Sequence, residues 1–213
     1  HADRAHDLTF LRQTILSEIA TAAGYTEFLV EEAFAVFDEE RNDVDMFPEA
    51  RPTLAALRER FTLVALTNGN ANLEKIGIAD LFDAHINAQM AGAAKPERPI
   101  FDAAVEAGGA SAGETLHVGD HPWFDVHGAR QAGLRTVWVN RNEQPWPDEY
   151  EAPDIEVRHI GELLELVGID VATASNGEEA LDVLEHERFD VVLMDVRMPR
   201  FVPKPIHRQI TTR

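Results

Sequence analysis

The sequence of 213 residues contains no cysteine, few basic residues and no long apolar run. Without cysteine the chain can form no disulfide and no thiolate metal site, and it has no thiol nucleophile. Nowhere do 18 apolar residues follow one another, so no segment is predicted to span a membrane. The first residues carry no targeting pattern, which leads us to expect a cytoplasmic location. They also lack an initiator Met, so we expect further sequence upstream.

Positive charge is scarce, with 19 Lys and Arg against 38 Asp and Glu and a net charge of −19. No long basic cluster offsets this charge, which argues against nucleic acid or an anionic membrane as a partner. A site for a phosphorylated metabolite would need positive charge concentrated locally, from side chains, a metal ion or backbone amides. Nothing in the composition indicates an oligomeric state.

Apolar periodicity predicts an α/β protein. Residues 8–37 have helical spacing broken by AAGY, which predicts two amphipathic helices, and a third helix at 50–60 leads into the strand-like run FTLVALTNGN. Helices and strands then alternate, and such alternation predicts a mostly parallel, doubly wound (Rossmann-like) sheet. The expected elements are helices at 72–76, 99–108, 124–133 and 160–168, strands at 85–89, 115–120 and 135–140, and an irregular loop at 140–154.

Polar residues follow the first strand-like run, where ligands bind in parallel sheets. Thr67, Asn68 and Gly69 offer a hydroxyl, an amide and backbone N–H groups, which suit one face of a phosphate. The alternative is a turn in which Thr67 and Asn68 only cap the next helix.

Two further stretches carry charge at such positions. Lys95 precedes Pro96, just before a helix, where it could offset phosphate charge; alternatively it is an ordinary exposed lysine. Asp120 ends the strand TLHVGD, and Asp125 follows near the start of a helix. Two such carboxylates can hold Mg²⁺, one as a direct ligand and one behind it, unless Asp125 is only a favourable acid in a first helical turn.

In this order and spacing, the three stretches resemble motifs two, three and four of the haloacid dehalogenase-like hydrolases. The resemblance runs from about Asp7 to Leu166 and is nearest to phosphatases with a helical cap. It implies that Thr67 binds the phosphoryl group, that Lys95 stabilises nucleophile and phosphate, and that Asp120 and Asp125 anchor Mg²⁺. It also implies a cap at residues 1–48 and a phosphatase core at 49–167.

The first motif of that family, a nucleophilic Asp ending the first strand, does not precede Thr67. Residues 168–213 instead resemble part of a response-regulator receiver domain, a flavodoxin-like fold, with Asp195 at the position that receivers phosphorylate. The run FDVVLMD is apolar on both faces, as a central parallel strand requires. We hypothesise that it completes the core sheet and brings Asp195 to the Mg²⁺ site as a catalytic residue and metal ligand; the alternative is a receiver fragment docked separately.

Two functions follow from these resemblances. The first is a Mg²⁺-dependent phosphomonoester hydrolase acting on a small phosphorylated metabolite, with activity impaired by the missing motif. The second is a non-catalytic or engineered chimeric module that binds phosphate and is phosphorylated on Asp195. Because Arg197 stands two residues beyond Asp195, where the family has an acid and base, phosphoryl capture is expected to outlast hydrolysis.

Overall fold

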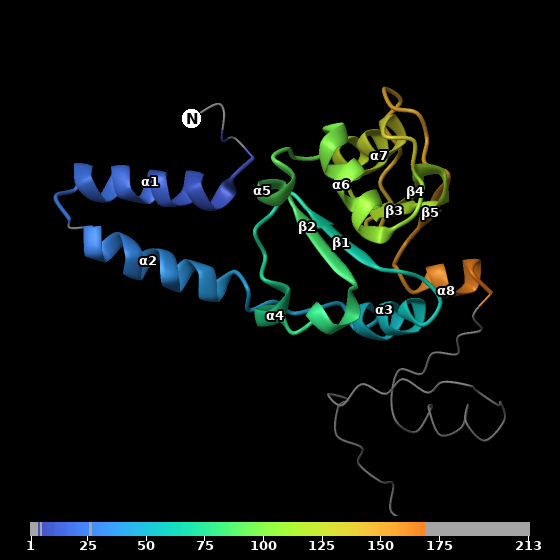
Figure 1. Ribbon diagram of the computed structural model, residues 1–213, viewed down its shortest axis with the longest axis horizontal. Helices are drawn as coiled ribbons and strands as arrows, with labels where there is room; N and C mark the ends of the chain where they lie inside the picture. The colour runs from blue at the N-terminus through green and yellow to red at the C-terminus, as the bar shows by residue number, and fades with distance from the viewer. Residues whose placement is uncertain (1–3, 5, 26, 169–213) are drawn as a thin grey trace, which may run out of the picture. The chain divides into compact units, whose positions relative to one another are not determined.

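The computed structural model describes residues 4, 6–25 and 27–168 (Figure 1). The chain divides into two compact units, residues 1–167 and 168–213. The elements predicted beyond residue 168, and Asp195 with them, lie outside the described residues.

The two predicted N-terminal helices form as α1 (Leu8–Ala22) and α2 (Glu27–Glu40), which lie side by side (Figure 1). Asp7 begins α1 because its carboxylate accepts a hydrogen bond from the backbone N–H of Phe10 at 2.9 Å. The expected apolar face of α1 is not covered, since none of its residues is buried and Ile19 is 61% exposed. Among the described residues no helix is both long and apolar enough to cross a membrane.

The first sheet consists of two parallel strands, β1 (Val64–Thr67) and β2 (Ala84–Asn87), with Thr67 opposite Asn87 at their carboxyl ends. Helix α3 (Ala50–Arg58) precedes it and buries Leu57. The connection between the strands contains α4 (Leu73–Ile76) and the 3-10 helix η2 (Ala79–Leu81), and the short helix α5 (Ala88–Ala91) follows β2.

The second sheet consists of three parallel strands in the order β3 (Leu116–Gly119), β4 (Arg135–Val139) and β5 (Ile155–Val157). Helix α6 (Arg98–Gly108) and the 3-10 helix η3 (Ala112–Glu114) precede it. A π-helical turn, η4 (Pro122–His127), continues into α7 (Gly128–Gln131) between β3 and β4, and α8 (Glu162–Leu166) follows β5.

Helix α6 connects the two sheets through the core. Its Ile100 and Phe101 are fully buried, and Leu66 of β1 and Ile86 of β2 pack against the cluster that they form. The Phe101 ring also meets the His117 ring of β3 edge-on, with centroids 5.3 Å apart. Both sheets therefore share one hydrophobic core on the α6 side.

The parallel α/β architecture predicted from the sequence is confirmed, but the strands do not form one continuous sheet. Within the described residues, β1 pairs only with β2, and β3 pairs only with β4. The expected buried strand β1 is only half-buried along its length. Each of β1 and β3 thus leaves one edge without a strand partner among the described residues, as expected where a central strand is missing.

Two local features differ from the sequence prediction. The helix predicted at 124–133 begins earlier, at Pro122, because the His121 ring Nδ1 accepts from the backbone N–H groups of Trp123 and Phe124, and its first part is a π-helical turn. Strand β5 was not predicted, since it is only three residues long and follows an acidic loop.

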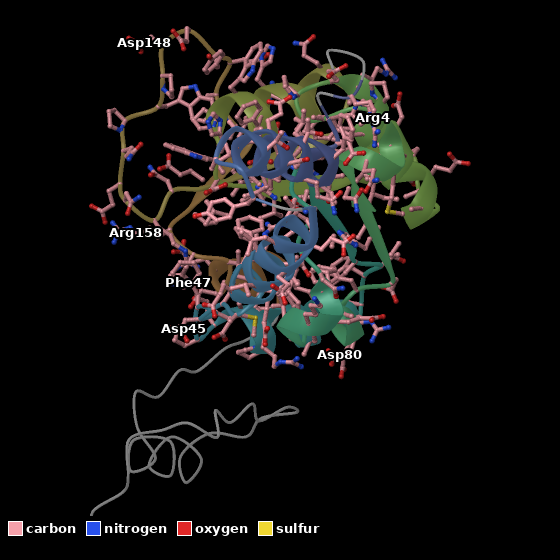
Figure 2. The ribbon with its side chains drawn as sticks, turned by 90° about the vertical axis from the view of Figure 1, so that its left-hand side faces the viewer. Arg4, Asp45, Phe47, Asp80, Asp148 and Arg158 are labelled. Carbon is pink, nitrogen blue, oxygen red and sulfur yellow. The ribbon has the colours of Figure 1, made fainter. Side chains whose placement is uncertain are left out.

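The loop at 140–154 is irregular, as predicted, and carries Asp148 outward (Figure 2). Its first part is nevertheless held in place. The Arg141 guanidinium lies 3.6 Å from the Phe47 ring centroid and forms an ion pair with Glu49, and Trp146 packs edge-on against Trp138. The loop therefore contacts the segment that links α2 to α3.

Candidate active site

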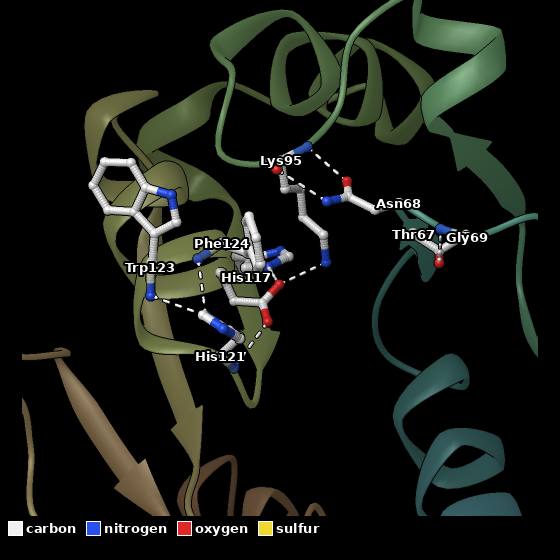
Figure 3. A network of polar contacts seen from close by, with 9 residues as sticks. Thr67, Asn68, Gly69, Lys95, His117, His121, Trp123 and Phe124 are labelled. Atoms are coloured by element: carbon white, nitrogen blue, oxygen red, sulfur yellow. Dashed lines mark hydrogen bonds and ion pairs between the residues drawn. The ribbon is translucent and has the colours of Figure 1, made fainter. Parts of the chain in front are cut away.

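The loops after β1 and β2 meet at the carboxyl end of the first sheet (Figure 3). The Asn68 side chain donates to the Lys95 carbonyl at 2.9 Å, and its oxygen accepts from the Lys95 backbone N–H at 2.6 Å. These two hydrogen bonds fix the backbone of Lys95, whose peptide bond to Pro96 is cis. Because the Asn68 amide is used in this way, its main observed role is to position the lysine loop.

Lys95 reaches from this loop to the carboxyl end of the second sheet, where its Nζ lies 2.6 Å from Asp125 Oδ1 (Figure 3). The side chains of the pair are only 13% and 6% exposed. Lys95 is therefore not an ordinary solvated lysine. The pair joins the end of the first sheet to the end of the second across the gap between β1 and β3.

Asp125 is the most enclosed acidic group of the site. His117 Nε2 lies 3.0 Å from its Oδ1, and the His121 backbone N–H donates to its Oδ2 at 3.0 Å. Burial acts to raise the pKa of Asp125, but the His117 hydrogen bond and the charge of Lys95 outweigh burial and hold the pKa far below its ordinary value. The carboxylate is ionised at neutral pH, so His117 donates to it.

Two glycines allow these groups to approach one another. A Cβ at Gly119 would lie 2.3 Å from Asp125 Cγ, and a Cβ at Gly128 would lie 2.8 Å from Pro96 Cα. Any larger residue at either position would push the helix after β3 away from the sheet or from the Lys95 loop. At the end of β3, Gly119 is therefore required for steric reasons, whereas the neighbouring Asp120 supplies a carboxylate.

Asp120 differs from Asp125 in being exposed. Its backbone carbonyl accepts from Trp138 Nε1 at 2.9 Å, while its carboxylate has no hydrogen bond or ion pair with the described residues. An accessible carboxylate at a strand end fits Mg²⁺, which keeps most of its waters and takes one or two protein carboxylates. In the described part of the chain no three acidic or histidine side chains are grouped to hold a metal, so a further ligand would come from elsewhere.

Thr67 ends β1, one residue before Asn68, and its Oγ1 accepts a hydrogen bond from the Gly69 backbone N–H at 2.9 Å (Figure 3). Its hydroxyl proton remains available for donation to an anion. The alternative role as a helix cap belongs to another residue, since the Asn72 side chain accepts from Glu74 N and Lys75 N at the start of α4.

The structure brings together Thr67, Asn68, Gly69, Lys95 and Asp125, with Asp120 at the end of the neighbouring β3. The partner that sequence reasoning missed is His117. A signal was present, because His117 and Gly119 lie two residues apart in a strand and therefore face the same side, over which Asp125 packs. The other two histidines nearby have separate partners, His121 in the η4 cap and His127 stacked on Trp123.

Comparison with family models gives two matches. Residues 5–133 match the haloacid dehalogenase-like hydrolase model, and residues 154–207 match the response regulator receiver domain model. The second match begins within the described unit, at the start of β5, and ends in the part of the chain beyond it.

Individual relatives include phosphatases and dehalogenases. The chain is 34% identical over 158 residues to a phosphoserine phosphatase of Thermus thermophilus, covering 71% of this chain and 63% of that protein. It is 31% identical over 173 residues to the 5-amino-6-(5-phospho-D-ribitylamino)uracil phosphatase of Escherichia coli K12, covering 76% and 71%. The crystal structure of a 2-haloacid dehalogenase from Pseudomonas syringae pv. tomato superposes with a TM-score of 0.75 at 36% identity, covering 78% and 74%.

The first family model covers more than half of the 213 residues, and the matched range contains both members of the Lys95–Asp125 pair. The chain therefore belongs to the haloacid dehalogenase-like hydrolase family.

Proposed function

We propose that this chain is a Mg²⁺-dependent phosphomonoester hydrolase for a small phosphorylated metabolite, with turnover impaired by the missing first motif. The observation that carries the proposal is the buried Lys95–Asp125 pair, which places a cation between the Thr67 turn and the acidic end of β3. In a chain of net charge −19, the Lys95 ammonium is one source of the local positive charge that a phosphate site requires.

Each residue of the site has a distinct part in this proposal. The Thr67 hydroxyl and the backbone around Asn68 and Gly69 bind the phosphoryl oxygens, and Lys95 balances their charge. Asp120 would bind Mg²⁺ directly. Asp125 would act on the metal site without being a direct ligand. When bound, Mg²⁺ would neutralise charge on the transferring phosphoryl group.

The nucleophile in this proposal is Asp195, or an Asp on sequence upstream of His1. Asp195 lies outside the described residues, so its place at the metal site remains a proposal. The motivation is that β1 and β3 each leave an edge without a strand partner among the described residues, and FDVVLMD has the pattern of a strand buried on both faces.

A phosphatase is favoured over a dehalogenase, although relatives of both kinds are found. Two carboxylates, Asp120 and Asp125, follow β3, and a cation-dependent reaction on phosphate uses such groups. The two phosphatases named above cleave phosphate esters of quite different metabolites, so we propose only the substrate class.

The test is release of inorganic phosphate from an aryl phosphate by the full chain, with and without Mg²⁺. Release that requires Mg²⁺ and disappears in Asp120→Ala would support the enzyme. A parallel assay for halide release from a 2-chloroacid identifies a dehalogenase. Absence of phosphate release at high protein concentration would exclude the phosphatase.

The second candidate, a receiver-type module that captures phosphate, is favoured by the receiver match at residues 154–207. It rests on Arg197, which cannot take the place of the acid and base needed to hydrolyse a phosphoaspartate. Incubation with acetyl phosphate and Mg²⁺ tests it. Stable labelling that is absent from Asp195→Asn supports capture, whereas labelling that persists in this variant removes Asp195 from the site.

A further inference from the structure

Two arginines from the cap converge on one side chain beside the phosphate-binding turn. Arg12 of α1 donates from Nη1 to Asn70 Oδ1 at 2.5 Å, and Arg41, directly after α2, donates to the same oxygen. Asn70 belongs to the turn that follows Thr67, and its amide donates to Thr9 Oγ1 at 2.8 Å. One neutral amide oxygen thus holds two positive charges.

Neither charge is neutralised by an ion pair in the described part of the chain. Other arginines there pair with carboxylates, as Arg51 does with Asp80 and Arg58 with Asp83, but neither Arg12 nor Arg41 forms an ion pair. The charge of Asp38 acts to raise the pKa of Arg41, but the Asp38 carboxylate is already 2.6 Å from Lys75 Nζ.

The environment of Arg41 is unfavourable for a lone cation. The residue is half-buried, and burial followed by the charge of Arg12 lowers its pKa. Two adjacent guanidinium groups repel each other, and an anion bound between them would relieve both the repulsion and the lost hydration. Each group still has unused N–H donors in the planar geometry that suits a carboxylate.

The position of the pair relates it to the phosphate site. Arg41 Nη2 lies 3.8 Å from the point where a Cβ at Gly69 would stand, and Thr67 Oγ1 lies 3.2 Å from the same point. A ligand whose phosphoryl group is bound at the Thr67 turn would therefore bring any second anionic group only a few bonds away to Arg41. The short distance between the Thr67 turn and Arg41 favours a small ligand whose second anionic group lies close to its phosphoryl group.

We propose that Arg12 and Arg41 bind a carboxylate of the substrate, so that the chain selects small phosphomonoesters that also carry a carboxylate. The inference rests on the proposed phosphate site, because it takes that site as the anchor for the other end of the ligand. Asn70 acts as the positioning residue that holds both guanidinium groups together between ligands.

The experiment is calorimetric titration of the full chain, with Mg²⁺, using O-phosphoserine, O-phosphoethanolamine and inorganic phosphate. The first two differ only in the carboxylate. Because charge-assisted hydrogen bonds to the carboxylate strengthen binding, phosphoserine should bind at least about tenfold more tightly than phosphoethanolamine. Arg41→Gln and Arg12→Gln should each reduce this preference several-fold and leave the affinity for inorganic phosphate within about twofold.

Arg51→Gln is the matched control, because Arg51 is an exposed arginine of α3 that pairs with Asp80. This variant should leave the preference for phosphoserine unchanged. Equal affinity of the wild-type chain for the two esters, or a preference that survives both cap variants, would overturn the inference and leave the phosphate site intact. Weaker binding of all three ligands in Arg41→Gln would assign Arg41 to the phosphoryl group instead. If none of the three ligands binds the wild-type chain, the proposed function itself fails, and the inference fails with it.

Discussion

Lys95 and Lys75 each form an ion pair with an aspartate at 2.6 Å, but they differ in burial. The Lys95 and Asp125 side chains are almost enclosed, whereas the Lys75 side chain is half exposed. Removing one partner of a buried pair leaves an uncompensated charge, while an exposed pair is replaced by water.

We therefore expect Lys95→Met to lower the free energy of unfolding by about 3 kcal/mol and Lys75→Met to lower it by less than about 1 kcal/mol. Urea denaturation of both variants at neutral pH without added metal measures the difference. Equal losses would show that Asp125 is solvated after all and that the link between the two sheet ends contributes little.

At the scale of elements, the pairing of β4 with β5 depends on one carboxylate. Asp154, directly before β5, accepts from the Thr136 backbone N–H at 2.7 Å and from the Thr136 hydroxyl at 2.9 Å, and it forms an ion pair with Arg130. The backbone hydrogen bond from Thr136 contributes most to lowering the pKa of Asp154 below its ordinary value of 3.8.

A lowered folded-state pKa stabilises the fold at pH values above the unfolded-state pKa, and this contribution is lost as the pH falls through the folded-state pKa. Asp154→Asn should therefore be less stable than the wild type at pH 7, and the difference should shrink below about pH 4. Unfolding in urea at pH 7, 5 and 3 measures this trend. Asp148→Asn, on the exposed part of the 140–154 loop (Figure 2), is the control. If the loss of stability in Asp154→Asn were the same at every pH, the charge of Asp154 would not stabilise the pairing of β4 with β5.

The same pair of strands lies where the chain passes from one family match to the other, since β4 follows the end of the hydrolase match at residue 133. The receiver match starts at residue 154, yet β5 pairs in parallel with β4, with Trp138 opposite Glu156. A short strand followed by a helix fits either α/β family, because in both it adds one parallel strand and covers it. The first strand within the receiver match therefore belongs to the same sheet as β3, which lies within the hydrolase match.

At the scale of the whole molecule, the edges of β1 and β3 decide whether the chain can be an enzyme. Backbone N–H groups along a parallel strand point alternately to its two neighbours, so a strand with one partner leaves half of them for solvent. If FDVVLMD pairs with these edges, amides of β1 and β3 should exchange slowly in the full chain.

Val192→Pro removes one backbone donor from that run and should raise deuterium uptake at β1 and β3 at least several-fold, whereas Val171→Pro, nearer the start of residues 168–213, should not. Hydrogen exchange read by mass spectrometry on both variants gives the comparison. Unchanged uptake at β1 and β3 in Val192→Pro would remove FDVVLMD from the core and Asp195 from the proposed site.

The sequence by itself determined the local structure of this protein and the chemistry of its motifs. Helical periodicity located α1, α2 and α6, and the change from apolar to polar residues located the ends of β1 and β3, because both patterns depend on neighbours in the chain. The absence of an Asp-bearing strand before Thr67 was also readable, and it matches the two separate sheets.

Only the tertiary structure decided which groups meet. The Lys95–Asp125 contact spans 30 residues, and the contacts of Arg12 and Arg41 with Asn70 span 58 and 29 residues. In the sequence, Lys95 is a candidate beside the alternative of an ordinary exposed lysine, and no pattern singles out Arg41, because the loss of solvent around a side chain depends on elements that pack from far along the chain. Burial and long-range contact, which no local pattern encodes, remove that alternative for Lys95 and make Arg41 a candidate for function.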